Sequence, residues 1–288
     1  MRAFALSAAL LLTACCISNS QPRLTGELKP LPRGLSPQAV LQQSLEYVFP
    51  ELIIGGEWTS TIRLANVSTK SIPTTTVYFL DNTGAPMKAQ FQAVTCTTSA
   101  GCQAGNPITD YGFTFFLSPG GIIEATFFGG SSTQFGHAVI DFCSTSSGCS
   151  SAGLYAQVTL RNSNPTRPDF ESVFPLEQPA PLQYMLWDHR NGLTTTLYLV
   201  NENTTSTTVT LTCTNPLGQT IGTYTLTLPS LASQILALHA VIPASIGQSG
   251  GLTISGSNSS SVALITATGL RINPSNSFTP LRAFIPAK

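Results

Sequence analysis

Short runs of alternating apolar and polar residues, separated by turn residues, constrain this chain more than any other feature. Ser60, Ile62 and Leu64 alternate with polar neighbours, and the run that ends at Phe79 leads into the turn sequence Asp-Asn-Thr-Gly of residues 81–84. A period of two is typical of strands that bury one face. Turn residues recur roughly every 8–12 positions, which favours antiparallel sandwiches over a parallel sheet. We therefore predict an all-β protein and find no helical stripe after Leu45.

The chain also contains an internal repeat. Residues 58–71 align without a gap with 193–206, and residues 77–84 align with 211–218 after one gap. Each half then has a strand, a turn with proline and a further strand, and later a Leu-Arg pair that closes a strand (Leu160-Arg161 and Leu270-Arg271). The repeat predicts two tandem antiparallel β-sandwich domains of like topology, over residues 46–180 and 181–288. The junction between them is rich in proline.

The N-terminus predicts export. Residues 1–14 have one early charge and an apolar run that is too short for a membrane-spanning helix, as in a signal peptide. The sequence Leu-Thr-Ala-Cys of residues 12–15 resembles the bacterial lipoprotein box, which implies cleavage before Cys15 and lipidation of Cys15. The alternative is an ordinary secretory signal that is cut later, near Ser20. Residues 15–45 are expected to form the lipidated N-terminus and a proline-rich tether.

The remaining cysteines fit an oxidising compartment. Cys96 and Cys102 are separated by five residues, as are Cys143 and Cys149, and a glycine precedes the second cysteine of each pair. We predict two local disulfides, although cross-pairing fits the same sequence. A four-cysteine zinc site is the alternative, but structural zinc usually requires shorter spacings. Cys213 lies in the register of apolar strand neighbours and is expected to be a buried, inert thiol.

Charge excludes several functions. Only 9% of the residues are charged, and 13 basic residues balance 13 acidic ones. Electrostatic binding to nucleic acid needs a basic surface, so no nucleic-acid partner is expected. Disorder is excluded as well, because 42% of the chain is hydrophobic. The outward strand positions are expected to carry Thr, Ser, Asn and Gln in place of charges.

No motif in the sequence points to an enzyme. His137 and Asp141 share a strand face, but four strand residues place them about 13 Å apart. His189 is expected at a polar hairpin tip and His239 near a strand end. A glycosidase would need two paired carboxylates. The carboxyl residues available are Glu51, Glu57, Glu124, Asp141, Asp169 and Glu171. Nothing in the sequence pairs them, and no metal site or cofactor is expected.

Aromatic residues offer a second type of site, because aromatic rings can stack on sugars. The residues available are Trp58, Trp187, Tyr78, Tyr155, Tyr184 and Tyr198. Trp58 and Phe79 fall on the inward register of their strands, whereas Tyr78 and Tyr198 fall on the outward register. Outward tyrosines are expected to be ordinary sheet-surface residues, with a sugar platform as the alternative.

The segments 47–58, 77–84 and 117–125 resemble bacterial exported proteins made of paired immunoglobulin-like β-sandwich modules. The resemblance covers most of residues 46–288 and implies a surface or envelope location without catalytic residues. We therefore expect a non-catalytic structural, adhesive or assembly module. It would be held at the outer membrane or cell surface by Cys15, or otherwise be secreted or periplasmic, with a protein or glycan partner. A carbohydrate-binding module and a hydrolase with a non-local site are the alternatives.

Overall fold

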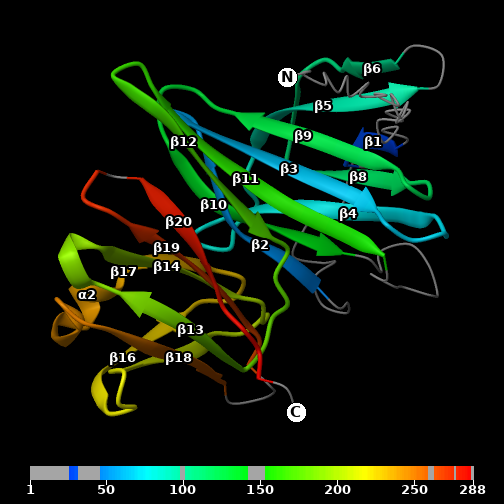
Figure 1. Cartoon of the computed structure of the whole chain (residues 1–288). Helices are drawn as coiled ribbons and strands as arrows, with labels where there is room; N and C mark the ends of the chain where they lie inside the picture. Colours follow the sequence, from blue (N-terminus) through cyan, green and yellow to red (C-terminus); the bar gives the residue numbers. More distant parts are fainter. Residues whose placement is uncertain are drawn as a thin grey trace, which may run out of the picture.

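The computed structural model describes residues 26–31, 46–97, 101–141, 153–258, 263–275 and 277–286. Over these ranges the chain is all-β, as predicted, with four antiparallel sheets and one four-residue α-helix. The strands are arranged as two pairs of sheets, one from the N-terminal part and one from the C-terminal part of the chain (Figure 1).

The N-terminal pair consists of sheets 1 and 2. In order across sheet 1, the strands are β1 (Gly26–Pro30), β8 (Gly112–Leu117), β4 (Ile72–Asp81), β10 (Gln134–Asp141) and β2 (Glu46–Ile54). In order across sheet 2, the strands are β12 (Arg167–Pro175), β11 (Leu154–Asn164), β3 (Trp58–Asn66), β9 (Ile122–Phe128), β5 (Ala89–Thr97) and β6 (Gly101–Ala104), with β7 (Ile108–Asp110) also paired to β5.

The C-terminal pair consists of sheets 3 and 4. In order across sheet 3, the strands are β13 (Leu182–Asp188), β18 (Ser249–Ser257), β15 (Thr207–Thr214) and β16 (Thr220–Leu228). In order across sheet 4, the strands are β17 (Ser233–Ala237), β14 (Thr194–Asn201), β19 (Ile265–Ile272) and β20 (Phe278–Arg282). The short helical segments are η1 (Arg190–Gly192), α2 (Leu238–Val241) and η2 (Pro243–Ser245).

Each pair of sheets encloses its own apolar core. Between sheets 1 and 2, Phe79 contacts Phe91, Phe113 and Phe127, with ring centroids 5.0 to 5.9 Å apart. Between sheets 3 and 4 the core is mainly aliphatic and includes the thiol of Cys213. Cys213 is fully buried, as predicted, and burial raises the pKa of its thiol to about 12.

The two pairs share one pairing order. The order β8-β4-β10-β2 in sheet 1 corresponds to β16-β15-β18-β13 in sheet 3, and β12-β11-β3-β9 in sheet 2 corresponds to β20-β19-β14-β17 in sheet 4. The aligned repeat of residues 58–71 and 193–206 therefore lies in equivalent strands, β3 and β14. Strands β1, β5, β6 and β7 are additions to this common pattern in the N-terminal pair.

Side-chain hydrogen bonds repeat together with the strands. Asn66 at the end of β3 donates to the carbonyls of Lys70 and Leu117, and Asn201 at the end of β14 donates to those of Thr205 and Leu228. Both asparagines are buried, and each accepts the backbone N–H two residues further on. The shared asparagine thus fixes the same loop in both halves.

Strand β1 differs from expectation. Residues 26–30 were expected to be part of the tether, but they pair with β8 along the edge of sheet 1. Leu28 of β1 packs against the core. The predicted tether therefore does not extend over these residues, and β8 is covered by the chain's own N-terminal segment.

The two pairs of sheets pack against each other through sheet 1 and sheet 4. In β4, β10, β14 and β19, six or five consecutive residues are buried, which requires both faces of each strand to be covered. A separate apolar cluster joins them, with Val48, Tyr78, Leu80 and Val139 from sheet 1 and Val200 from sheet 4. Near this contact, Phe278 of β20 stacks on Trp58 of β3 with ring centroids 5.8 Å apart.

The turn after β4 locks this contact. Asn82 accepts the backbone N–H and the side-chain hydroxyl of Ser233, which lies in β17. Gly84 has φ +84°, and a Cβ added to it would lie 2.5 Å from the carbonyl oxygen of Ser230. The turn predicted from the sequence is therefore also a docking element, and only glycine fits at its last position.

We predict that Gly84→Ala destabilises the protein more than Gly218→Ala does. Gly218 is the equivalent turn residue after β15, with φ +77° and no atom within 4 Å of an added Cβ. Both variants carry the left-handed backbone penalty of about 1–2 kcal/mol, and only Gly84→Ala adds a backbone clash of about 1–3 kcal/mol. Urea unfolding of both variants measures the difference. Equal losses would contradict tight docking of this turn.

Candidate functional site

Several residues that the sequence offered as site candidates lie between the two pairs of sheets. Glu51, Tyr78, His137 and Asp141 come from sheet 1, and Tyr198 comes from sheet 4. Tyr78 and Tyr198 are on the outward register of their strands, as predicted, but the opposite sheet covers them. The prediction that they are sheet-surface residues is therefore wrong, and the two rings do not form a sugar platform.

A β-bulge places Glu51 in this interface. Pro50 and Glu51 of β2 together face the single residue His137 of β10. Proline fits here because β2 is an edge strand and the bulge needs no ladder hydrogen bond from it. The carboxyl of Glu51 is consequently directed away from water, next to the Tyr198 hydroxyl of the opposite sheet.

Burial changes the protonation of these groups. It raises the pKa of Glu51 well above its ordinary value, and the Tyr198 hydroxyl lowers it only in part. Burial likewise lowers the pKa of His137 to about 4, and the Asp81 carboxylate offsets this only in part. Burial raises the pKa of Glu202 to about 8, near the Thr266 hydroxyl. At neutral pH, His137 and Glu202 are thus mainly uncharged, and burial shifts the equilibrium of Glu51 in the same direction.

The other carboxyl candidates lie in or next to the strands of sheet 2. Glu124 accepts hydrogen bonds from Arg63 on the outer face of this sheet, Asp169 accepts from Arg161 on the same face, and Glu57 accepts from Asn164. These contacts support the expectation that Glu124 is a solvent-facing strand carboxylate. Glu171 lines the same hollow of about 370 Å³ on this face as Glu124, where the Arg63 guanidinium pairs with the Glu124 carboxylate.

The environment of His189 was not foreseen. The polar hairpin tip predicted for His189 is wrong, because its ring is buried against Trp187 and His239, with ring centroids 5.2 and 5.7 Å away. His189 Nδ1 is 2.9 Å from the hydroxyl of Ser245, which itself donates to the carbonyl of Ile242. Because Ser245 is fully buried and its proton is held by that carbonyl, it is not placed as a nucleophile.

Of the cysteines predicted to be lipidated or to form disulfides, Cys96 and Cys102 fall in the described ranges. They are direct partners in the register of the β5–β6 hairpin, a spacing that suits a disulfide. The disulfide itself stays a prediction. Cys15, Cys143 and Cys149 lie outside the described residues. Within the described ranges, no group of three or more His, Cys, Asp or Glu side chains is arranged to hold a metal ion.

A hollow that opens to solvent lies at one end of the C-terminal pair, between β13, β18 and the turn after β15 of sheet 3 and β19 and β20 of sheet 4. Its volume is about 600 Å³. The lining residues are Leu186, Trp187, Asp188, Arg190, Asn215, Pro216, Gly218, Ser249, Gly250, Gly251, Arg271 and Leu281. We call this hollow the seam, because it lies where the edges of the two sheets separate.

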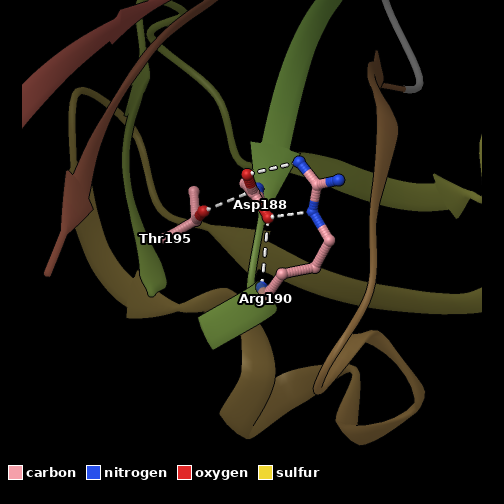
Figure 2. Close-up of polar contacts among 3 residues, drawn as sticks. All are labelled: Asp188, Arg190 and Thr195. Atoms are coloured by element: carbon pink, nitrogen blue, oxygen red, sulfur yellow. Dashed lines mark hydrogen bonds and ion pairs between the residues drawn. The ribbon is translucent and has the colours of Figure 1, made fainter. Parts of the chain in front are cut away.

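An ion pair rigidifies one wall of the seam. Figure 2 shows the Asp188 carboxylate accepting hydrogen bonds from Arg190. The donors are Nε and Nη2, at 2.9 Å each, and the backbone N–H, at 3.1 Å. The backbone N–H of Asp188 in turn reaches the hydroxyl of Thr195 on β14 (Figure 2). These hydrogen bonds and the charge of nearby Arg271 lower the pKa of Asp188 to about 2. Asp188 is therefore an anion at any physiological pH.

The sequence indicates the seam only weakly. Asp188 and Arg190 are two residues apart, but Arg271 is far from both in the chain and stands out only through the repeated Leu-Arg pair at 270–271. One signal was available, because Arg271 continues the inward register of Ile265 and Ala267, where a charge is unusual.

Comparison with known proteins does not assign the chain to a family. No protein-family model matches the sequence, and no curated protein matches it significantly. In the part of the chain that the structure describes, no helix is long and apolar enough to cross a membrane.

We predict that the contribution of Glu202 to the stability of the protein falls as pH rises from about 4.5 to 8, and that Glu202→Gln removes this contribution. The pKa of Glu202 is raised from 4.5 to about 8. The folded protein therefore keeps a proton that the unfolded chain loses in this range, at about 1.4 kcal/mol per pKa unit.

Thermal unfolding at pH 5 and pH 9 measures the effect. The free energy of unfolding of Glu202→Gln, taken relative to that of wild type, should be several kcal/mol more favourable at pH 9 than at pH 5. Glu57→Gln, which changes an exposed carboxyl, serves as the control. Parallel pH profiles for wild type and Glu202→Gln would contradict a neutral, buried Glu202.

Proposed function

We propose that the protein is a non-catalytic cell-envelope or surface module with an adhesive or assembly role. In this proposal the two pairs of sheets are tandem immunoglobulin-like domains, exported by residues 1–14 and anchored through a lipid on Cys15. The repeated pairing order and the resemblance in sequence support the first part, and the lipoprotein-like sequence before Cys15 supports the second.

The outer face of sheet 3 is the observation that carries the adhesive role. Thr208, Thr210 and Thr212 of β15 stand opposite Thr227, Thr225 and Thr223 of β16, respectively. On the other side of β15, Thr210 and Thr212 stand opposite Ser255 and Thr253 of β18. We call this array of half-exposed and exposed hydroxyls the threonine face.

The threonine face suits contact with another surface. Strands β15, β16 and β18 contain no charged residue. By contrast, the outer face of sheet 2 carries the ion pairs Arg63–Glu124 and Arg161–Asp169. A neutral face of β-branched hydroxyls loses less hydration energy on contact than a charged one, and it lacks the lysines that commonly block association of sheets.

We predict that lysines on the threonine face weaken attachment. Thr210→Lys and Thr225→Lys together place two like charges opposite each other on this face, where Oγ1 of Thr210 and Oγ1 of Thr225 are 3.4 Å apart. Binding of the purified mature chain to immobilised cell-envelope material should weaken at least about tenfold, since burying a charge in a contact is costly.

The control is Thr159→Lys on the outer face of sheet 2, where charges are already present. It should leave attachment unchanged. Unchanged attachment of the Thr210→Lys/Thr225→Lys variant, with its fold intact by circular dichroism, would contradict the threonine face as the adhesive surface.

We predict that Cys15→Ser abolishes lipid anchoring. In the producing bacterium the variant should leave the membrane fraction, and mass spectrometry should detect no acyl chains on it. Cys16→Ser tests the adjacent cysteine and should leave anchoring intact. A wild-type chain that starts beyond Cys16 without acylation would favour the alternative of an ordinary secretory signal.

A further inference from the structure

We infer that the seam binds the C-terminal end of an extended partner polypeptide whose last residue is apolar. This inference rests on the proposed adhesive or assembly role, for which it names a class of partner. Three observations support it: β13 has an unpaired edge, Arg271 forms no hydrogen bond or ion pair with the described residues, and the walls of the seam are apolar.

The unpaired edge belongs to β13. Tyr184 exchanges both backbone hydrogen bonds with Phe284, at 2.9 and 2.8 Å, so its N–H and C=O point away from β18. Backbone direction alternates along an antiparallel strand, and Leu186 therefore presents its N–H and C=O on the same side. No hydrogen bond to Leu186 is formed from this side by the residues that the structure describes.

The chain's own C-terminal segment shows how this edge is used. The segment around Phe284 adds to β13 at Tyr184, and β20 then diverges towards β19. Leu186 and Leu281 line the seam at this divergence, and β18 and the turn after β15 line the rest of it. An added extended peptide would continue the edge by one further pair of hydrogen bonds, as in strand addition to a sheet edge.

The charges at the seam favour an anion. Arg190 is committed to Asp188 through two of its nitrogens, whereas Arg271 makes no hydrogen bond or ion pair with the described residues. Two guanidinium groups and one carboxylate leave one positive charge in excess. A guanidinium binds a carboxylate through parallel N–H donors, which favours Arg271 as the carboxylate-binding group.

The walls favour an apolar side chain beside that carboxylate. Leu281 and Pro216 line the seam, and the side chain of Leu186 is 66% exposed at its rim. Trp187 is buried and donates its indole N–H to the carbonyl of Gly251, so it closes the floor and is not a free stacking surface. A carboxylate and an apolar side chain on one carbon atom describe the C-terminal residue of a peptide.

The test uses three synthetic probes and the isotope-labelled mature chain. The probes are acetyl-Ala-Val-Leu with a free carboxylate, the same peptide with a C-terminal amide, and the free acid with an N-methylated valine. Titrations followed by amide NMR should show shifts at Leu186 and at Gly250 and Gly251. The free acid should bind at least tenfold more tightly than the amide, and N-methylation should weaken binding by removing a donor to the strand edge.

Arg271→Gln should reduce the affinity for the free acid to that for the amide. Arg63→Gln, which changes an exposed arginine of sheet 2, is the control and should change nothing. Thermal unfolding establishes that both variants are folded, and Arg271→Lys should recover part of the affinity because it restores the charge.

Equal binding of acid and amide, shifts outside the seam, or no binding at millimolar peptide would each overturn the inference. None of these outcomes affects the threonine face, because the Thr210→Lys/Thr225→Lys experiment tests that surface separately. Conversely, peptide binding at the seam with unimpaired attachment of that variant would retain the seam and remove the adhesive role of the threonine face.

Discussion

The contact between sheet 1 and sheet 4 is the constraint on which the rest of the structure depends. Each sheet already covers a core on one face, and this contact covers the other face, so β4, β10, β14 and β19 are buried throughout. The two pairs of sheets, which the chain connects through a segment that contains Pro179 and Pro181, are thereby held against each other. The turn at Gly84 adds a backbone contact that no larger residue allows.

This contact explains why a chain with few charges buries several ionisable groups. Burial disfavours the charged forms of Glu51, His137 and Glu202, and none of the three forms an ion pair with a Lys or Arg of the described residues. Glu177, at the margin of the contact, has an ion pair with Arg282, and burial still raises its pKa to about 7. Such groups make the contact dependent on pH, because ionisation of a buried carboxyl costs free energy.

Much of the fold could be predicted from the sequence, and little of the candidate sites. Alternation predicted β3 and β10, and the repeat predicted that β3 and β14 are equivalent, down to Asn66 and Asn201. The predictions for Tyr78, Tyr198 and His189 failed for one reason: alternation separates the two faces of a strand but does not say whether a second sheet or a helix covers the outer one. Strand β1 was missed because five residues among prolines show no alternation.

The sequence by itself determined the all-β class, the positions of most strands and turns, the duplication and the burial of Cys213, because these follow from local backbone preferences and the two-residue period. Only the tertiary structure decided which outward faces meet each other and which meet water. Packing of the sheets buries the outward side chain of Tyr78 and leaves the threonine face and the seam exposed to solvent. The physical reason is that burial depends on contacts between distant segments, and residues such as Asp188 and Arg271 become neighbours only when the sheets are packed.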